Sequence, residues 1–247
     1  DVPWHKYIED IIGVIFKGEV SLPEEFSLKN FFSGYGRLEQ IDMRDLNTEN
    51  VVSMQSMFAD CERLQFADLS GRNTSNVISM SRMFQDCKGL RYVDLSGIDT
   101  SNVTGMSQMF AGCSSLEEVN LSGLDTSNVA SMLGMFMNCG KLKAIDLSGF
   151  DTSSVTDMSM MFSNCAGLEE LDVSGFNTEN VQDMSSMFLF CRNLKRLFTG
   201  DMNTEKVRDM SNMFAHCKSL RSLDLESFDT SRADDISGMF SGCDGLQ

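Results

Sequence analysis

Apolar and polar positions along the chain follow two patterns that return together every 26 residues. In the unit that begins at Leu90, the alternation of Val93 and Leu95 with polar neighbours predicts a short strand with one exposed face. Farther along, the apolar residues from Val103 to Leu116 fall at i, i+3, i+6, i+7, i+10 and i+13, a stripe typical of a helix of about three turns. Each unit is therefore expected to contain a strand, a tight turn and a short helix that returns to the next strand.

Four residue types keep this period in eight consecutive units: a threonine ahead of the expected helix, a phenylalanine, a cysteine and a leucine. The cysteines are Cys61, Cys87, Cys113, Cys139, Cys165, Cys191, Cys217 and Cys243. Self-similarity at such a period indicates that one unit cannot bury its own apolar face and must stack on its neighbours. The sequence therefore predicts an elongated solenoid.

The order of elements within a unit also predicts the shape of the stack. Thr100 and Ser101 occupy the positions of helix N-caps, and Gly97 lies where the chain must leave the strand sharply with a positive φ. Parallel strands stack about 4.8 Å apart, whereas packed helices need about 8–10 Å. We therefore expect an α/β solenoid curved as a horseshoe, with a parallel β-sheet on its concave side and short helices on its convex side.

The two ends of the chain depart from the repeat. Residues 1–37 are expected to form an N-terminal helical cap with a degenerate repeat, and residues 38–247 to form eight repeats. The helical face of the cap would consist of Trp4, Tyr7, Ile8, Ile11, Ile12 and Ile15. The degenerate repeat would place Leu28, Phe31, Phe32 and Tyr35 where later units carry Met, Met, Phe and Cys. Because Gln247 directly follows the leucine that should open another strand, we expect an uncapped C-terminal end that continues in the parent protein.

Charge and hydropathy narrow the kinds of partner. The formal net charge of −16 disfavours nucleic acids and anionic membrane surfaces, which would repel such a chain, and it favours a cationic partner. A membrane-spanning helix needs a run of about 18 or more apolar residues, and the sequence contains none. No membrane span is therefore predicted.

The cysteine and methionine columns are expected to lie in the core. Regular spacing differs from the irregular spacing of disulfide-stapled domains, and the lack of C-x-x-C pairs disfavours zinc, so we expect free, buried thiols. Most methionines lie in two columns, Met54 to Met210 and Met57 to Met239. A surface for apolar partners or copper(I) is the alternative, but helical spacing beside Phe and Cys favours packing.

The repeat itself resembles a known bacterial family. The motif L-x-x-V-D-L-S-G-x-D-T-S-N-V-x-x-M-S-x-M-F-x-x-C-x-x-L runs from Leu90 to Leu116 and returns almost unchanged from Leu142 to Leu168. It is similar to the 26-residue surface repeat of the BspA-like leucine-rich repeat group, and the similarity spans 38–246. The resemblance implies a leucine-rich-repeat-like fold and parent proteins that are secreted, lipid-linked or wall-anchored and associated with adhesion. It implies no catalytic residues.

One polar column of the predicted strand carries the most distinctive chemistry, and we name it the acidic column: Asp42, Asp68, Asp94, Asn120, Asp146, Asp172, Phe198 and Asp224. Successive carboxylates about 5 Å apart repel by about 1 kcal/mol each in water, so something should offset the repulsion. One interpretation is a face for Ca²⁺ or for a partner segment rich in Lys and Arg. The other is that the aspartate belongs to the repeat itself and is held by neighbouring serine hydroxyls or by water.

Departures from the repeat indicate where a partner would bind, because the scaffold does not demand them. The unit at Leu194 carries Arg196 and Phe198 in place of acidic or hydroxyl residues, and Phe66 and Tyr92 add aromatic rings, which suits an aromatic and basic contact site. The candidate ligand-binding residues on the concave face are Asp68, Tyr92, Asp94, Asn120, Asp146, Asp172, Arg196, Phe198 and Asp224. No metal-binding residue and no cofactor are predicted, with Ca²⁺ as the one alternative.

The sequence offers little for catalysis. His5 and His216 are its two histidines, no catalytic triad can be assembled, and the common nucleotide-binding and hydrolase motifs are missing. The predicted function is a non-catalytic, extracellular or cell-surface module for adhesion, which binds a host or matrix protein with a basic segment. A passive spacer that displays other domains of a longer surface protein is the alternative, and an intracellular interaction scaffold is a third.

Overall fold

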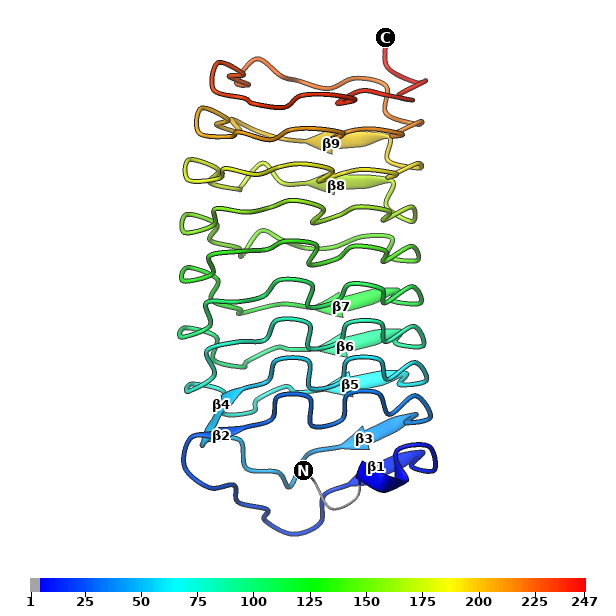
Figure 1. Ribbon diagram of the computed structural model, residues 1–247, viewed down its shortest axis with the longest axis vertical. Helices are drawn as coiled ribbons and strands as arrows, with labels where there is room; N and C mark the ends of the chain where they lie inside the picture. The colour runs from blue at the N-terminus through cyan, green and yellow to red at the C-terminus, as the bar shows by residue number, and fades with distance from the viewer. Residues whose placement is uncertain (1–4) are drawn as a thin grey trace.

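The computed structural model describes residues 5–247 and stacks them as successive coils in a single column (Figure 1). Its elements are a 3-10 turn η1 (His5–Tyr7) and the strands β1 (Gly13–Ile15), β2 (Phe26–Ser27), β3 (Gln40–Asp42), β4 (Val51–Ser53), β5 (Phe66–Asp68), β6 (Tyr92–Asp94), β7 (Glu118–Asn120), β8 (Glu170–Asp172) and β9 (Arg196–Phe198). The solenoid of parallel strands predicted from the repeat is confirmed.

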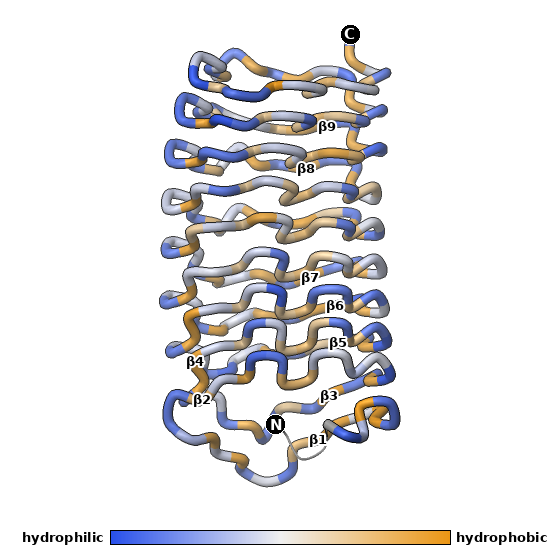
Figure 2. The backbone as a smooth tube through the Cα atoms, viewed as in Figure 1, coloured by the Kyte–Doolittle hydropathy of each residue, from blue (hydrophilic) through white to orange (hydrophobic). Residues whose placement is uncertain are grey.

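Two sides of most coils are extended and pair with the same sides of neighbouring coils. On the strand side, β5, β6 and β7 form one parallel sheet and β8 and β9 another, in a register of one repeat that aligns Phe66 with Tyr92 and Glu170 with Arg196. On the opposite side, β2 pairs with β4, and a ladder of single parallel bridges continues it through Ser53, Ser79, Gly105, Ser131, Asp157, Asp183, Asp209 and Asp235. Figure 2 shows hydrophilic residues gathered mostly at the loops along both edges of the column.

The predicted helix is wrong: residues 5–247 contain no α-helix, and two consecutive β-turns occupy its place in each coil. We name this stretch, Met106–Cys113 and its equivalents, the turn segment. The amides of Met109 and Cys113 donate to the carbonyls of Met106 and Phe110, three residues back, at 3.2 and 3.1 Å. The amide of Phe110 instead donates to Met135 of the next coil at 2.9 Å. An α-helix would use the carbonyl four residues back, but consecutive turns also place residues three apart on one face, which is why the spacing imitated a helix.

The third residue of each turn has a positive φ, which produces two left-handed positions per coil. The first column is Ser56, Arg82, Gln108, Gly134, Met160, Ser186, Asn212 and Gly238, and the second is Asp60, Asp86, Gly112, Asn138, Asn164, Phe190, His216 and Gly242. Six members of the second column are Asp, Asn or Gly, the residues that best tolerate this conformation. This column was the sequence signal for turns that the helix prediction missed.

The predicted horseshoe loses its physical basis together with the helices. Curvature was expected because helices need more room than strands, but both sides of the coils are linked by backbone hydrogen bonds at strand spacing. In Figure 1 the coils accordingly form an upright column, with β1 near one end and the C-terminus at the other. The α/β class and the convex helical layer are therefore corrected to a solenoid of parallel strands and turns.

The core between the two sides is a line of stacked columns. The phenylalanines stack from Phe32 to Phe240, with ring centroids 5.4–5.9 Å apart and planes within 10°. The methionine columns are buried beside them, as predicted. Such parallel, offset rings add to the free energy of apolar burial. The degenerate unit joins the same core, because Leu28, Phe32 and Tyr35 are all fully buried.

The N-terminal segment does not form the predicted helix. Tyr7 lies in η1 and Ile15 in β1, and Ile8, Ile11 and Ile12 lie in the irregular stretch between them. Strand β1 pairs in parallel with β3 and aligns Val14 with Ile41. Ile8, Ile11 and Val14 pack against the core from this arrangement. Trp4, assigned to the predicted helical face, lies outside the described residues.

The cysteine column consists of free thiols, as predicted, and each of the first seven is buried. The thiol of Cys113 donates to the carbonyl of Phe84 at 3.0 Å, and the equivalent bond recurs along the stack. Burial raises the pKa of Cys61 to about 12. The sulfurs therefore remain protonated and link neighbouring coils.

The repeated threonine also links coils, so the N-cap prediction is wrong. Thr100 is buried, and its hydroxyl donates to the carbonyl of Asp125 in the next coil at 2.8 Å while accepting the amide of the same residue at 2.8 Å. The same donation recurs from Thr48 to Thr204. A buried hydroxyl needs a partner, and here the partner is always the adjacent coil.

Candidate functional site

The acidic column lies on the strand side, and each of its aspartates accepts the backbone amide of the residue two positions later. Oδ1 of Asp172 accepts the amide of Ser174 at 2.9 Å and its hydroxyl at 2.6 Å, and Asp94 accepts the amide of Ser96 at 2.8 Å. These hydrogen bonds lower the pKa of both carboxyls. The interpretation that neighbouring serines hold the aspartates is therefore right, and Asp94 and Asp172 are ionised at neutral pH.

One oxygen of several of these carboxylates remains available. Oδ1 of Asp68, Asp146 and Asp172 is engaged by the serine two residues later, whereas Oδ2 of each has no hydrogen bond within residues 5–247. All three residues are exposed. The same side chain can therefore support its coil through one oxygen and bind a cation through the other.

Aromatic residues flank the N-terminal half of the column. Phe66 is 56% exposed and lies in register with Tyr92, which lies in register with Glu118. The hydroxyl of Tyr92 donates to Oδ2 of Asp94 at 3.2 Å, and Asn120 accepts from Ser122. This end of the strand side combines apolar rings with carboxylates.

The departures in β9 lie on a separate sheet. Arg196 forms an ion pair with Glu170, and Phe198, which is 48% exposed, lies in register with Asp172. The coil of residues 143–148 separates this sheet from β5–β7. The structure therefore does not gather the aromatic and basic candidates into one contact site. Asp224 lies beyond Phe198, where no strand is formed.

The break between the two sheets opens a pocket. No backbone hydrogen bond joins residues 143–148 to either adjacent coil, although equivalent residues elsewhere pair, as when the amide of Leu95 donates to Asn120 at 3.0 Å. A cavity of about 240 Å³ lies between this coil and the next. Its lining includes Ile145, Asp146, Leu147, Asp172, Val173 and Phe176. We name it the inter-coil pocket.

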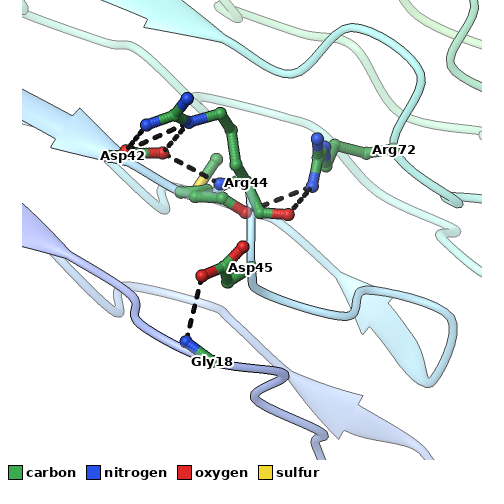
Figure 3. A network of polar contacts seen from close by, with 6 residues as sticks. Gly18, Asp42, Arg44, Asp45 and Arg72 are labelled. Atoms are coloured by element: carbon green, nitrogen blue, oxygen red, sulfur yellow. Dashed lines mark hydrogen bonds and ion pairs between the residues drawn. The ribbon is translucent and has the colours of Figure 1, made fainter.

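A second cavity, of about 390 Å³, lies near the N-terminal end and holds the polar network of Figure 3. Nε and Nη2 of Arg44 donate to the two carboxylate oxygens of Asp42 and lower the pKa of that carboxyl to about 2. Arg72 donates to the carbonyls of Met43 and Arg44 at 3.2 and 2.7 Å, and Asp45 accepts the amide of Gly18 at 3.0 Å. These charged side chains bond to one another and to backbone groups of neighbouring coils, so we interpret the network as structural.

Sequence reasoning missed the role of Arg72. Arg72 occupies the repeat position at which other coils bury an apolar residue, such as Leu46 or Ile98. The signal was available in the sequence, since one arginine interrupts a column that is otherwise Leu, Ile, Phe or Met.

The part of the chain that is described holds no candidate metal cluster and no candidate membrane-spanning helix. Among its His, Cys, Asp and Glu side chains, no group of three lies close enough to hold a metal ion. No helix within it has the length and apolarity to cross a bilayer.

Comparison with known proteins identifies the repeat. The chain matches the family described as Mycoplasma protein of unknown function, DUF285, over residues 26–118, 87–199 and 169–247. No curated protein matches it.

Among the solved structures with a similar fold are bacterial leucine-rich repeat proteins. The T. pallidum leucine-rich repeat protein is 21% identical with a TM-score of 0.51, over 74% of this chain and 78% of that one. A leucine-rich repeat protein from Bacteroides ovatus is 14% identical with a TM-score of 0.44, over 86% of this chain and 60% of that one. A leucine-rich cell surface protein from Faecalibacterium prausnitzii is 14% identical with a TM-score of 0.40, over 96% and 80%. At these identities the T. pallidum structure supports the fold alone.

Proposed function

Because the chain belongs to the DUF285 family and to the BspA-like leucine-rich repeat group, we propose that it is a non-catalytic protein-binding module of a bacterial surface protein. Leucine-rich repeat solenoids generally present an extended face to protein partners. A surface location and a role in adhesion follow from the resemblance and belong to this proposal. No catalytic family is indicated by the matches.

The observation that carries the proposal is the acidic column on the strand side. One oxygen of Asp68, Asp146 and Asp172 accepts no hydrogen bond within the described residues, and exposed rings lie beside them. A protein segment rich in Lys and Arg would offset the repulsion between carboxylates of neighbouring coils. With a net charge of −16, long-range attraction would also speed its encounter with such a partner.

The competing function is a passive spacer. It is favoured by the unbroken bridge ladder from Ser53 to Asp235 and by the continuous phenylalanine stack, which suit a rigid rod. A spacer would bind nothing along the strand side and would act only through its length.

A displayed library of short peptides, selected on the immobilised chain, separates the two functions. A binding module is expected to enrich peptides rich in Lys or Arg that bind saturably and weaken about tenfold when Asp68, Asp94, Asp146 and Asp172 are all changed to Asn. Asn is tolerated in this column, because Asn120 already accepts the amide of Ser122 at 3.2 Å. The spacer would instead be established by two results together. No basic peptide would be enriched, and deletion of residues 90–141, which shortens the column by two coils, would abolish the display of another domain of the parent protein.

A further inference from the structure

The inter-coil pocket differs in kind from the rest of the acidic column. Asp42, Asp68, Asp94 and Asp172 stand on paired strands, whereas Asp146 and Asp224 lie outside the strands, and the coil of Asp146 makes no backbone hydrogen bond to its neighbours on this side. The backbone just after the acidic column also changes at this coil. The repeated glycine there has a positive φ at Gly71, Gly97 and Gly123 but not at Gly149 or Gly175. The two coils are therefore not held together here by the strand pairing that joins β5 to β6, β6 to β7 and β8 to β9.

The walls of the pocket are apolar and its mouth is acidic. Leu147, Val173 and Phe176 are each less than 8% exposed and contribute hydrocarbon surface, while Asp146 and Asp172 contribute two carboxylates. Serine hydrogen bonds lower the pKa of both carboxyls. Each carboxylate uses Oδ1 for its own turn, so Oδ2 of each is the acceptor available to a guest.

The size of the pocket limits the guest to one side chain. Sites for drug-sized ligands measure about 300–1,000 Å³, and this cavity, at about 240 Å³, is smaller. A guest that fits must combine an aliphatic stem with a cationic head, as the side chains of Arg and Lys do. The guanidinium of arginine is planar, carries five donors and sheds water more readily than an ammonium group, so it suits two separate carboxylates better.

We propose that the inter-coil pocket binds an arginine side chain of a partner segment, with its stem between the two coils and its guanidinium between Asp146 and Asp172. This assignment rests on the proposed function and names the anchor through which the strand side recognises its partner. Arginine is a frequent anchor at protein interfaces because a buried, paired guanidinium contributes much of the binding free energy. The rest of the acidic column would then steer the basic segment toward this pocket.

The test uses the free blocked amino acid Nα-acetyl-arginine N-methylamide as the probe, followed by amide shifts in two-dimensional NMR of the full chain. We expect saturable shifts confined to residues 145–148 and 173–176. The matched control probe is the citrulline derivative, which has the same shape without the charge and is expected to give no saturable shift. The lysine derivative is expected to bind more weakly than arginine, and equal or tighter binding of lysine would contradict the guanidinium assignment.

Variants locate the site. Asp146→Asn with Asp172→Asn is expected to weaken the probe about tenfold, whereas Asp68→Asn with Asp94→Asn should leave its affinity within about twofold. Ile145→Trp, which fills the pocket and keeps both charges, is expected to abolish binding while the dispersed amide spectrum shows that the chain is folded. Shifts spread evenly along the acidic column, or equal losses in the two double variants, would overturn the pocket.

The outcomes also separate this inference from the proposed function. If basic library peptides bind the chain and resist Asp146→Asn with Asp172→Asn, the pocket is refuted and the protein-binding function stands. If the arginine probe occupies the pocket and no library peptide binds, the pocket stands and the protein-binding function fails.

Discussion

The turn segment and the strand side are built from the same coils, yet they differ in how much variation they accept. Phenylalanine rings and the bridge ladder continue through all eight repeats beside the turn segment. The strand side is divided into three sheets, β1 with β3, β5–β7 and β8 with β9, and its outward column changes at almost every coil: Phe66, Tyr92, Glu118, Ala144, Glu170, Arg196 and Ser222. The side with the turn segment therefore supplies the stability of the stack, whereas the strand side accepts different residues from coil to coil.

The largest expected effect comes from removing one ring of the phenylalanine stack. Phe136→Ala should cost about 3–5 kcal/mol of unfolding free energy, because the ring is fully buried between Phe110 and Phe162. Phe198→Ala, on the strand side, should change it by less than about 0.5 kcal/mol since that ring is largely exposed. Urea denaturation followed by circular dichroism measures both, and similar losses would remove the distinction between the two sides.

A smaller loss is expected when a link between coils is cut without changing side-chain volume. Thr100→Val leaves the carbonyl and amide of Asp125 without the hydroxyl that both use, which should cost about 1–3 kcal/mol. Thr104→Val is the matched control, because the Thr104 hydroxyl is exposed and lies 3.4 Å from the Ile78 carbonyl. The same denaturation experiment applies, and a neutral Thr100→Val would show that the threonine column is not an inter-coil bond.

Substitutions that conflict with the backbone conformation should separate the stabilities of the two sides by a smaller amount. Asn138 has a φ of 64°, so Asn138→Val should cost about 1–2 kcal/mol through left-handed strain, whereas Asn138→Gly should be nearly neutral. Ala144→Val on the strand side introduces the same side chain where φ is not positive and should be tolerated. Thermal melting of the three variants checks the order, and a stable Asn138→Val would argue for a helix after all.

The smallest effect concerns the exposed ion pair at the N-terminal end of the acidic column. The pKa of Asp42 lies at about 2, below its usual 3.8, chiefly because Arg44 donates hydrogen bonds to it. A lowered folded pKa means that the ionised group stabilises the fold above pH 3.8 and that this contribution is lost as the pH falls through about 2. Arg44→Ala should raise the pKa toward 3.8, as NMR titration of the carboxyl carbon would show; an unchanged value would contradict the pairing.

The buried columns could be predicted from the sequence because their chemistry is independent of backbone shape. Phe, Met and Cys at fixed places in every repeat must stack whether the segment between them is helical or turned, so the free thiols and the methionine core followed directly. The candidate site was predictable only in part. The serine partners of Asp94 and Asp172 follow from their spacing, whereas the placement of Tyr92 and Phe198 on different sheets depends on which coils form strands.

The sequence alone determined the period, the stacking and the identity of the buried residues. It did not determine the backbone of the turn segment, because helices and consecutive turns both place apolar residues three apart on one face. The hydrogen bonds that distinguish the turns from a helix run to the next coil. Nor did it reveal the inter-coil pocket, because the repeat from Leu142 to Leu168 matches the motif almost fully. Whether residues 143–148 pair depends on both adjacent coils together, and that relation exists only in the tertiary structure.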